Sequence, residues 1–153
     1  MSRTLAAFSL ALLLPLNSAV AAQESASESA LAYTFKDPQL KWGPCPPFLP
    51  KGCEIAVLHG DPSKPNVDVF FKVPPGSSIP GHIHSSPERM VLVSGQLEVT
   101  YEGQAPAKLK VGTYAYGPAK KPHKAVCAKG APCVLFIAFE SPLDATPTEA
   151  PAK

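Results

Sequence analysis

Proline is the residue that most limits what this chain can fold into. It occupies 19 of the 153 positions, more than twice its usual share of ~5%. A proline lacks the backbone N–H donor, so it disrupts helix interiors and central strands but suits turns and strand ends. Because 45% of the residues are hydrophobic, the chain still has enough apolar material to form a core. These features exclude a helical bundle and predict short strands joined by proline-rich turns.

The length and charge of the chain narrow the class of partner. A chain of 153 residues suits one domain with a tail rather than a large multidomain enzyme. Its 14 basic and 12 acidic residues give a net charge of only +2, which provides no strong attraction to nucleic acid or to a membrane surface. We therefore expect a small-molecule ligand or substrate, with no nucleic-acid partner and no membrane partner after processing.

The N-terminus has the layout of a secretory signal peptide. Arg3 precedes a nearly continuous apolar run from Leu5 to Leu16, and small residues fill positions 18–22. This order is typical of a cleaved signal over residues 1–22, with cleavage after Ala21 or Ala22. The alternative is an uncleaved anchor, but the run is shorter than the ~20 residues of a membrane-spanning helix. We predict an exported protein, located in the periplasm or secreted.

Export to an oxidising compartment would also determine whether the four cysteines form disulfides. Four cysteines in an exported protein favour two disulfides, for which three pairings exist. Cys45 and Cys53 enclose seven residues, and Cys127 and Cys133 enclose five that suit a hairpin loop. The simplest pairing is therefore Cys45–Cys53 and Cys127–Cys133. The alternatives are four free thiols in a reducing compartment, or Cys127 as a reactive thiol in a pocket.

The alternation of apolar and polar residues places a single all-β domain at residues 33–141. A polar linker at 23–32 precedes this domain, and a disordered tail at 142–153 follows it. No window in the domain fits a buried helix, whereas about nine segments alternate as strands do. These are 54–59, 67–73, 79–84, 88–94, 96–101, 108–111, 113–116, 121–127 and 134–140. A sandwich or barrel of short strands follows.

Three histidines and a glutamate form the most informative group of polar residues. His82 and His84 are two positions apart, so their side chains share one face of a strand. Glu88 follows a short Ser-Ser-Pro turn and can return toward them, and His123 begins a later predicted strand. Three imidazoles and one carboxylate are a ligand set for a transition metal. His59 ends a strand beside a turn, and we expect it to have a surface or structural role.

The glycines around these residues complete a recognisable spacing. From Gly76 to Gly95 the chain reads G-x5-H-x-H-x3-E-x6-G, and from Gly112 to His123 it reads G-x5-P-x4-H. The sequence here resembles the cupin superfamily, whose two motifs have this spacing. It departs from the second motif twice, with Lys120 where a glycine is usual and Cys127 where an asparagine is usual.

The resemblance implies a double-sheet jelly-roll barrel with one divalent metal ion inside it. By match, His82, His84, Glu88 and His123 become the ligands, and an open coordination position would be left for substrate. The chain has no Arg-Arg pair near its start, so we expect export in the unfolded state and metal loading outside the cytoplasm. Loading in competition favours copper or zinc over iron, manganese and nickel.

Strand parity and residue type suggest what surrounds the metal. Met90 shares the face of Glu88 and is a candidate for the ligand pocket, as are Tyr114, Tyr116 and Lys120. Lys120 belongs to a run with Lys121 and Lys124, which would favour an anionic ligand if it rims the pocket and is otherwise a solvated face. Val91 and Val93 face outward, so a second layer that includes Trp42, or a homodimer partner, should cover them.

Two classes of function fit this sequence. One is a metalloenzyme, such as a metal-dependent dioxygenase or isomerase, with oxygenase-like or Lewis-acid chemistry on a small molecule that carries negative charge if the lysines line the site. Glu88 would then be a ligand or a base, and no other residue has an obvious catalytic role. The alternative is a non-catalytic protein of the cell envelope that binds a metal or a small ligand.

Overall fold

The computed structural model describes residues 28–148, and within them the chain is all-β with no helix. The predicted signal peptide, the first half of the predicted linker and the last five residues lie outside the described residues. No helix of the described part is long and apolar enough to cross a membrane. The strands are β1 (Trp42–Pro44), β2 (Glu54–His59), β3 (Val67–Val73), β4 (Ser78–Ile83), β5 (Glu88–Ser94), β6 (Leu97–Tyr101), β7 (Ala107–Leu109), β8 (Tyr114–Gly117), β9 (His123–Cys127), β10 (Cys133–Phe139) and β11 (Thr146–Pro147).

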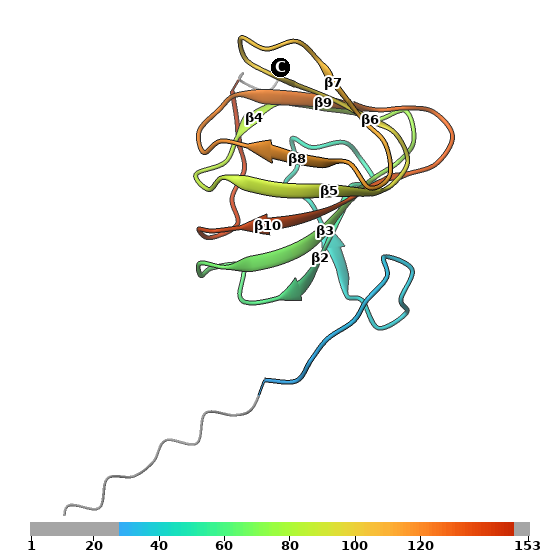
Figure 1. Ribbon diagram of the computed structural model, residues 1–153, viewed down its shortest axis with the longest axis vertical. Coiled ribbons are helices and arrows are strands. Elements are labelled where there is room, and N and C mark those ends of the chain that lie inside the picture. The colour runs from blue at the N-terminus through green and yellow to red at the C-terminus, as the bar shows by residue number, and fades with distance from the viewer. Residues whose placement is uncertain (1–27, 149–153) are drawn as a thin grey trace, which may run out of the picture. The chain divides into compact units, whose positions relative to one another are not determined.

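The strands form two antiparallel sheets, as the jelly-roll prediction requires (Figure 1). One sheet has six strands in the order β1-β2-β3-β10-β5-β8, and the other has five in the order β11-β4-β9-β6-β7. The main hydrophobic core contains residues from both sheets, including Val69 and Leu92 from the first and Leu97 and Ala125 from the second. The core therefore lies between the sheets, and the all-β double-sheet prediction is confirmed.

The predicted alternation explains which faces of the strands are buried. In β5, Glu88, Met90 and Leu92 are buried, whereas the residues between them are only half-buried. Val93 on the opposite face packs in a second hydrophobic cluster with Trp42. The Lys72 ammonium lies 4.0 Å from the centre of the Trp42 ring, a cation–π contact on the same layer. A second layer that includes Trp42 thus covers the outer face at Val93.

The nine predicted segments correspond to β2 through β10, and the structure adds two short strands. β1 pairs with β2, and β11 pairs with β4. The predicted domain ends at Ser141, but residues 142–148 pack against the domain instead of extending from it as a tail. In addition to the β11 pairing, the amide of Leu143 donates a hydrogen bond to the carbonyl of Pro62 at 2.9 Å. Since β11 spans only two residues, no alternation in the sequence could indicate it.

Both expected cysteine pairs are disulfide-bonded. Cys45–Cys53 ties the end of β1 to the start of β2, and Cys127–Cys133 joins β9 to β10. The Cα atoms are 5.5 and 5.8 Å apart, within the usual range for a disulfide. With all four cysteines paired and no free cysteine among the described residues, Cys127 is not available as a pocket thiol in this form.

Candidate metal centre

Three buried histidines from two neighbouring strands meet at one end of the space between the sheets. His82 lies on β4 directly opposite His123 on β9, and His84 follows the end of β4. Each histidine contributes one ring nitrogen to a cluster in which the three nitrogens lie within 4.8 Å of one another. The three side chains are 6 to 8% exposed. Pairing of the two strands thus assembles residues that are about 40 positions apart in the sequence.

Hydrogen bonds fix which nitrogen of each ring faces the centre. The Nδ1 atoms of His82 and His123 donate to the carbonyl oxygens two residues before them, at 2.8 and 3.0 Å. The Nδ1 atom of His84 donates to the carbonyl oxygen of Asp144. Because a carbonyl only accepts, each Nδ1 carries the hydrogen and each Nε2 keeps a free lone pair. Such carbonyl partners are the usual outer-sphere support of metal-binding histidines.

Glu88 faces two of these rings at the start of β5. Its Oε1 atom lies 3.3 Å from Nε2 of His84, and its Oε2 atom lies 3.3 Å from Nε2 of His123. In this tautomeric state, an ionised Glu88 would bring two acceptors together at both contacts without a hydrogen between them. A cation at the centre would turn this unfavourable arrangement into shared coordination.

The protonation states also suit a cation. Burial lowers the pKa of His82, and it lowers those of His84 and His123 to about 4. The imidazoles are therefore neutral near pH 7, as ligands must be. In the metal-free protein, burial raises the pKa of Glu88 to about 8, so the carboxyl group keeps its proton near pH 7, and a bound cation would favour its ionised form. The three histidines could hold a metal ion, and the donor chemistry of all four residues fits one.

The loop that carries His84 and Glu88 is held from two sides. The Ser85 amide donates to Oδ1 of Asp144 at 2.8 Å, so Asp144 contacts this loop through both its side chain and its main chain. Ser86 is only 1% exposed. Its hydroxyl accepts hydrogen bonds from the amides of Glu140 and Ser141 at 2.8 and 3.1 Å. Sequence reasoning missed Asp144 and Ser86, since their partners lie more than 50 positions away.

A buried tyrosine lies beside the centre, outside the ligand group. The Tyr101 ring packs on His123 with ring centres 4.9 Å apart. Its buried hydroxyl has no hydrogen-bond partner among the described residues. Burial, with a smaller effect from nearby Glu88, raises the pKa of Tyr101. Gly117 makes this packing feasible, because a methyl group there would overlap the Tyr101 hydroxyl and lie 3.0 Å from Oε2 of Glu88.

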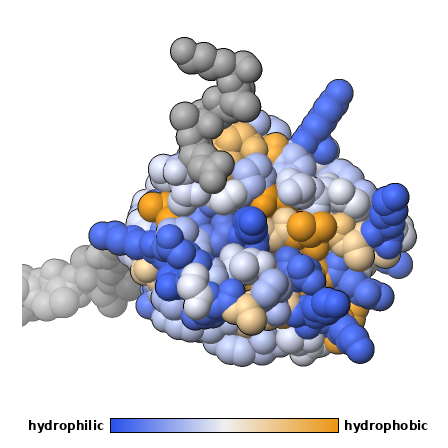
Figure 2. All heavy atoms as spheres, turned by 90° about the horizontal axis from the view of Figure 1, so that it is seen from above, coloured by the Kyte–Doolittle hydropathy of each residue, from blue (hydrophilic) through white to orange (hydrophobic). Residues whose placement is uncertain are grey.

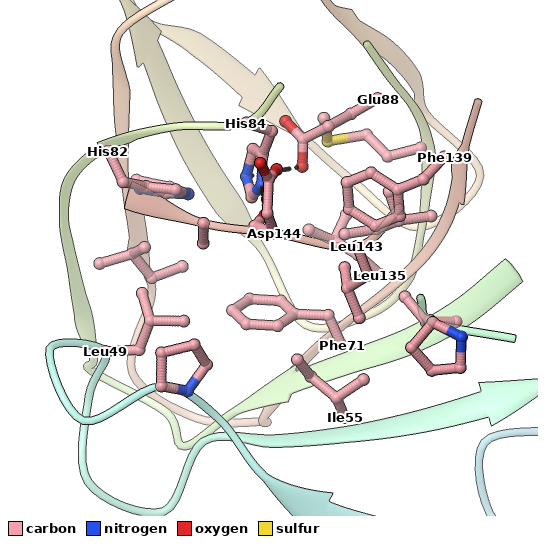
Figure 3. A pocket seen from close by; sticks show the side chains of 18 of the residues that line it. Leu49, Ile55, Phe71, His82, His84, Glu88, Leu135, Phe139, Leu143 and Asp144 are labelled. Carbon is pink, nitrogen blue, oxygen red and sulfur yellow. Dashed lines mark hydrogen bonds and ion pairs between the residues drawn. The ribbon is translucent and has the colours of Figure 1, made fainter. Parts of the chain in front are cut away.

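A cavity of about 370 Å³ extends from the histidines between the two sheets. Figure 3 shows His82, His84, Glu88 and Asp144 at one end of it, with Leu49, Ile55, Phe71 and Leu135 toward the other. Besides these, the wall is formed by glycine, proline and other apolar residues: Gly43, Pro44, Pro46, Val57, Pro62, Val69, Ile79, Met90, Leu97, Val99, Ala125, Ile137, Phe139, Leu143 and Ala145; His123 completes the polar end.

The other predicted pocket residues divide into two groups. Met90 lines the cavity, as its shared face with Glu88 indicated. Tyr114 and Tyr116 are 59% and 52% exposed on β8, and Lys120 is exposed in the following turn. None of these three lines the cavity, because β8 directs Gly117 inward and its two tyrosines outward. His59 is exposed at the end of β2 and lies outside the histidine cluster.

Comparisons with known proteins agree with this architecture. A family model described as a cupin domain matches residues 69–139. Among solved structures, the DMSP lyase DddQ from Ruegeria pomeroyi DSS-3 is 21% identical with a TM-score of 0.61, covering 71% of this chain and 61% of the lyase. The polyketide cyclase RemF from Streptomyces resistomycificus is 18% identical with a TM-score of 0.63, and the match covers 79% of this chain and 88% of RemF. An RmlC-like cupin from Shewanella frigidimarina NCIMB 400 is 20% identical with a TM-score of 0.58, and the match covers 74% of this chain and 93% of that protein.

These likenesses concern the fold. The chain spans about three fifths of the length of DddQ, and identities of 18 to 21% do not carry an activity from one protein to another. No curated protein sequence matches the chain. The match over residues 69–139 includes all three clustered histidines and Glu88. With its double-sheet fold and its match to the cupin-domain model over residues 69–139, the chain contains a cupin domain.

Proposed function

We propose that this protein is an exported cupin that binds one divalent first-row metal ion and uses it on a small organic molecule in the cavity. His82, His84, His123 and Glu88 would hold the ion. The observation that carries the proposal is the position of this four-residue donor set at the polar end of a ligand-sized cavity. Cavities of this volume fall in the range of small-molecule sites.

The residues of the chain have separate parts in this function. The three histidines offer Nε2 lone pairs that are oriented by their Nδ1 hydrogen bonds, and Glu88 supplies the negative charge. Asp144 and Ser86 hold the loop between His84 and Glu88 in place. When bound, a divalent ion in such a site supplies Lewis acidity and, if it is redox-active, a route for electron transfer. The apolar wall excludes bulk water from the reacting end.

The proposed export is supported by the signal-like N-terminus and by two disulfides, which persist in oxidising compartments. Export in the unfolded state would load the metal outside the cytoplasm, where the affinity order favours copper or zinc. N-terminal sequencing of the mature protein should begin at Ala22 or Gln23. Retention of Met1 would contradict export by a cleaved signal.

Metal analysis of purified variants tests the proposed ligand set. The wild-type protein should contain about one divalent ion per chain. His82→Ala and His123→Ala should each lose most of it, because water replaces a neutral nitrogen ligand poorly. Glu88→Gln should weaken binding less, since its amide oxygen can still reach the ion. His59→Ala, outside the cluster, is the matched control and should keep wild-type content. Wild-type metal content in both histidine-ligand variants would mean that the site lies elsewhere.

One observation favours a second function, which is binding of a metal or ligand without turnover. Apart from the four donors, Asp144 is the one titratable residue among the described residues that line the cavity, so few groups could transfer a proton to a substrate. Redox titration of the loaded protein separates the two functions in part. An ion that is redox-silent and coordinatively saturated would support storage or delivery, whereas an ion with an exchangeable position would support catalysis.

A further inference from the structure

The cavity has its polar groups at one end only. Figure 3 shows His82, His84, Glu88 and Asp144 grouped together, and the side chains farther from them are hydrocarbon. No lysine or arginine is found among the described residues that line the cavity. The outer face of the molecule in Figure 2, by contrast, is largely hydrophilic with scattered apolar residues. A ligand in the cavity can therefore satisfy polar groups at its metal-facing end and nowhere else.

The charge of the site restricts the ligand further. Three neutral imidazoles and one carboxylate carry a charge of −1, so a divalent ion would leave the ligand group at +1. Asp144 is the other charged residue of the lining, and its carboxylate accepts the Ser85 amide. Because burying a charge without a partner is costly, the cavity can accept an uncharged or singly anionic head group. A second anionic group would have to lie in the apolar part.

We propose, resting on the proposed function, that the cavity binds a small molecule with an apolar body and a single uncharged or singly anionic head group that contacts the metal. Its volume of about 370 Å³ is near the lower end of ligand-binding cavities, which suits a compact body such as an aromatic ring or a short branched chain. Each hydroxyl of a sugar, or each extra carboxylate of a polyacid, would lose hydrogen bonds to water and find no partner in the wall.

The lining indicates how such a molecule lies in the cavity. Ile55 and Val57 line the cavity from β2, and Val57 is 39% exposed. Pro44 also lines it and is exposed. Asp144, at the polar end, also lines the cavity and is exposed. Exposed lining residues therefore lie both beside β2 and near the histidines, and a ligand bound through its head group would leave its apolar body against β2.

Calorimetric titration of the zinc-loaded, full-length mature protein tests this inference with two probes that share a head group. Acetohydroxamate and benzohydroxamate both bind zinc through the hydroxamate, but one carries a methyl group and the other a phenyl ring. After each affinity is corrected for the affinity of the probe for free zinc, benzohydroxamate should bind on the order of tenfold tighter or more. Citrate, a polyanion, should bind no more tightly than acetohydroxamate.

Substitutions in the apolar wall test whether it causes the tighter binding of benzohydroxamate. Ile55→Glu should remove most of the advantage of benzohydroxamate over acetohydroxamate, and the zinc content of the variant checks that the metal site is intact. Ile55→Gln, a milder change, gives the same test if Ile55→Glu does not fold. Val126→Glu is the matched control, because Val126 is 49% exposed on β9 and does not line the cavity. It should bind both probes as the wild-type protein does.

The outcomes separate this inference from the proposed function. Equal corrected affinities for the two hydroxamates, tighter binding of citrate, or an unchanged preference in the Ile55 variants would overturn the inference while the zinc site stands. A protein that binds no zinc, or whose zinc is unaffected by His82→Ala, would overturn the proposed function and this inference with it.

Discussion

Replacing Glu88 with glutamine should stabilise the metal-free protein while weakening its affinity for a metal. Glu88 is 5% exposed, and burial raises its pKa from the ordinary 4.5 to about 8. Below about pH 8 the folded protein must therefore hold a proton on Glu88 that the unfolded chain releases. A neutral amide of the same shape has no such cost, and its N–H group can donate to Nε2 of His84 or His123.

The gain in stability from Glu88→Gln depends on pH, and the difference between the Glu88 pKa in the folded and unfolded states determines its sign. Between pH 4.5 and about 8 the unfolded chain has Glu88 ionised while the folded protein keeps its proton, so the free energy of unfolding falls as pH rises. At about 1.4 kcal/mol per pH unit, the cost at pH 7 is roughly 3 kcal/mol. Glutamine does not titrate, so its advantage should be small near pH 4.5, grow through pH 7 and level off above about pH 8.

Urea unfolding of both proteins in the presence of a chelator, with disulfides intact, measures this difference. The comparison at pH 5 and pH 8 removes effects that the two proteins share, such as titration of the histidines. Glu102→Gln, at an exposed position, is the control and should show little change in stability at either pH. An advantage of Glu88→Gln that is the same at both pH values, or larger at pH 5, would refute the reasoning that burial raises the pKa of Glu88.

Three further changes test the packing around the site by urea unfolding of the metal-free protein. Tyr101→Phe removes a buried hydroxyl that has no partner and should leave stability unchanged or raise it by about 1 kcal/mol; a loss above that size would reveal a hydrogen bond. Gly117→Ala brings a methyl group against Tyr101 and Glu88 and should cost roughly 1–3 kcal/mol, so a neutral result would contradict the described packing. Replacing Cys127 and Cys133 together with serine should cost roughly 2 kcal/mol, and wild-type stability would show that this bridge does not constrain the unfolded chain.

Much of the fold could be predicted because its signals are local. The residues of β5 alternate between buried and half-buried as the sequence does, and positive-φ glycines such as Gly95 lie between strands where turns were expected. The positions of His82, His84 and Glu88 follow from strand periodicity and one short turn. The sequence spacing of these residues therefore carries most of the information that brings them together.

The residues that escaped prediction depend on distant contacts. Asp144 lies in a segment rich in proline and small residues, and only its pairing with the loop after β4 gives it a structural role. Lys120 and Lys124 are close to His123 in the sequence, but strand alternation and a turn with positive φ at Lys120 leave both exposed. The expectation of an anionic ligand relied on sequence proximity to His123, which in a strand does not imply a shared face.

The residues of the cavity wall come partly from inside and partly from outside the region that matches the cupin domain. His82, His84, Glu88 and His123 all lie within residues 69–139, the region that matches the cupin domain. Leu49 and Ile55 come before this region, and Leu143 follows it, yet all three line the cavity. The proposed metal ligands thus belong to the matched part of the fold, whereas segments outside it shape the space that a ligand would occupy. A fold neighbour that matches chiefly this part can therefore indicate how the strands are arranged, while the identity of the ligand has to be derived from the wall of this chain.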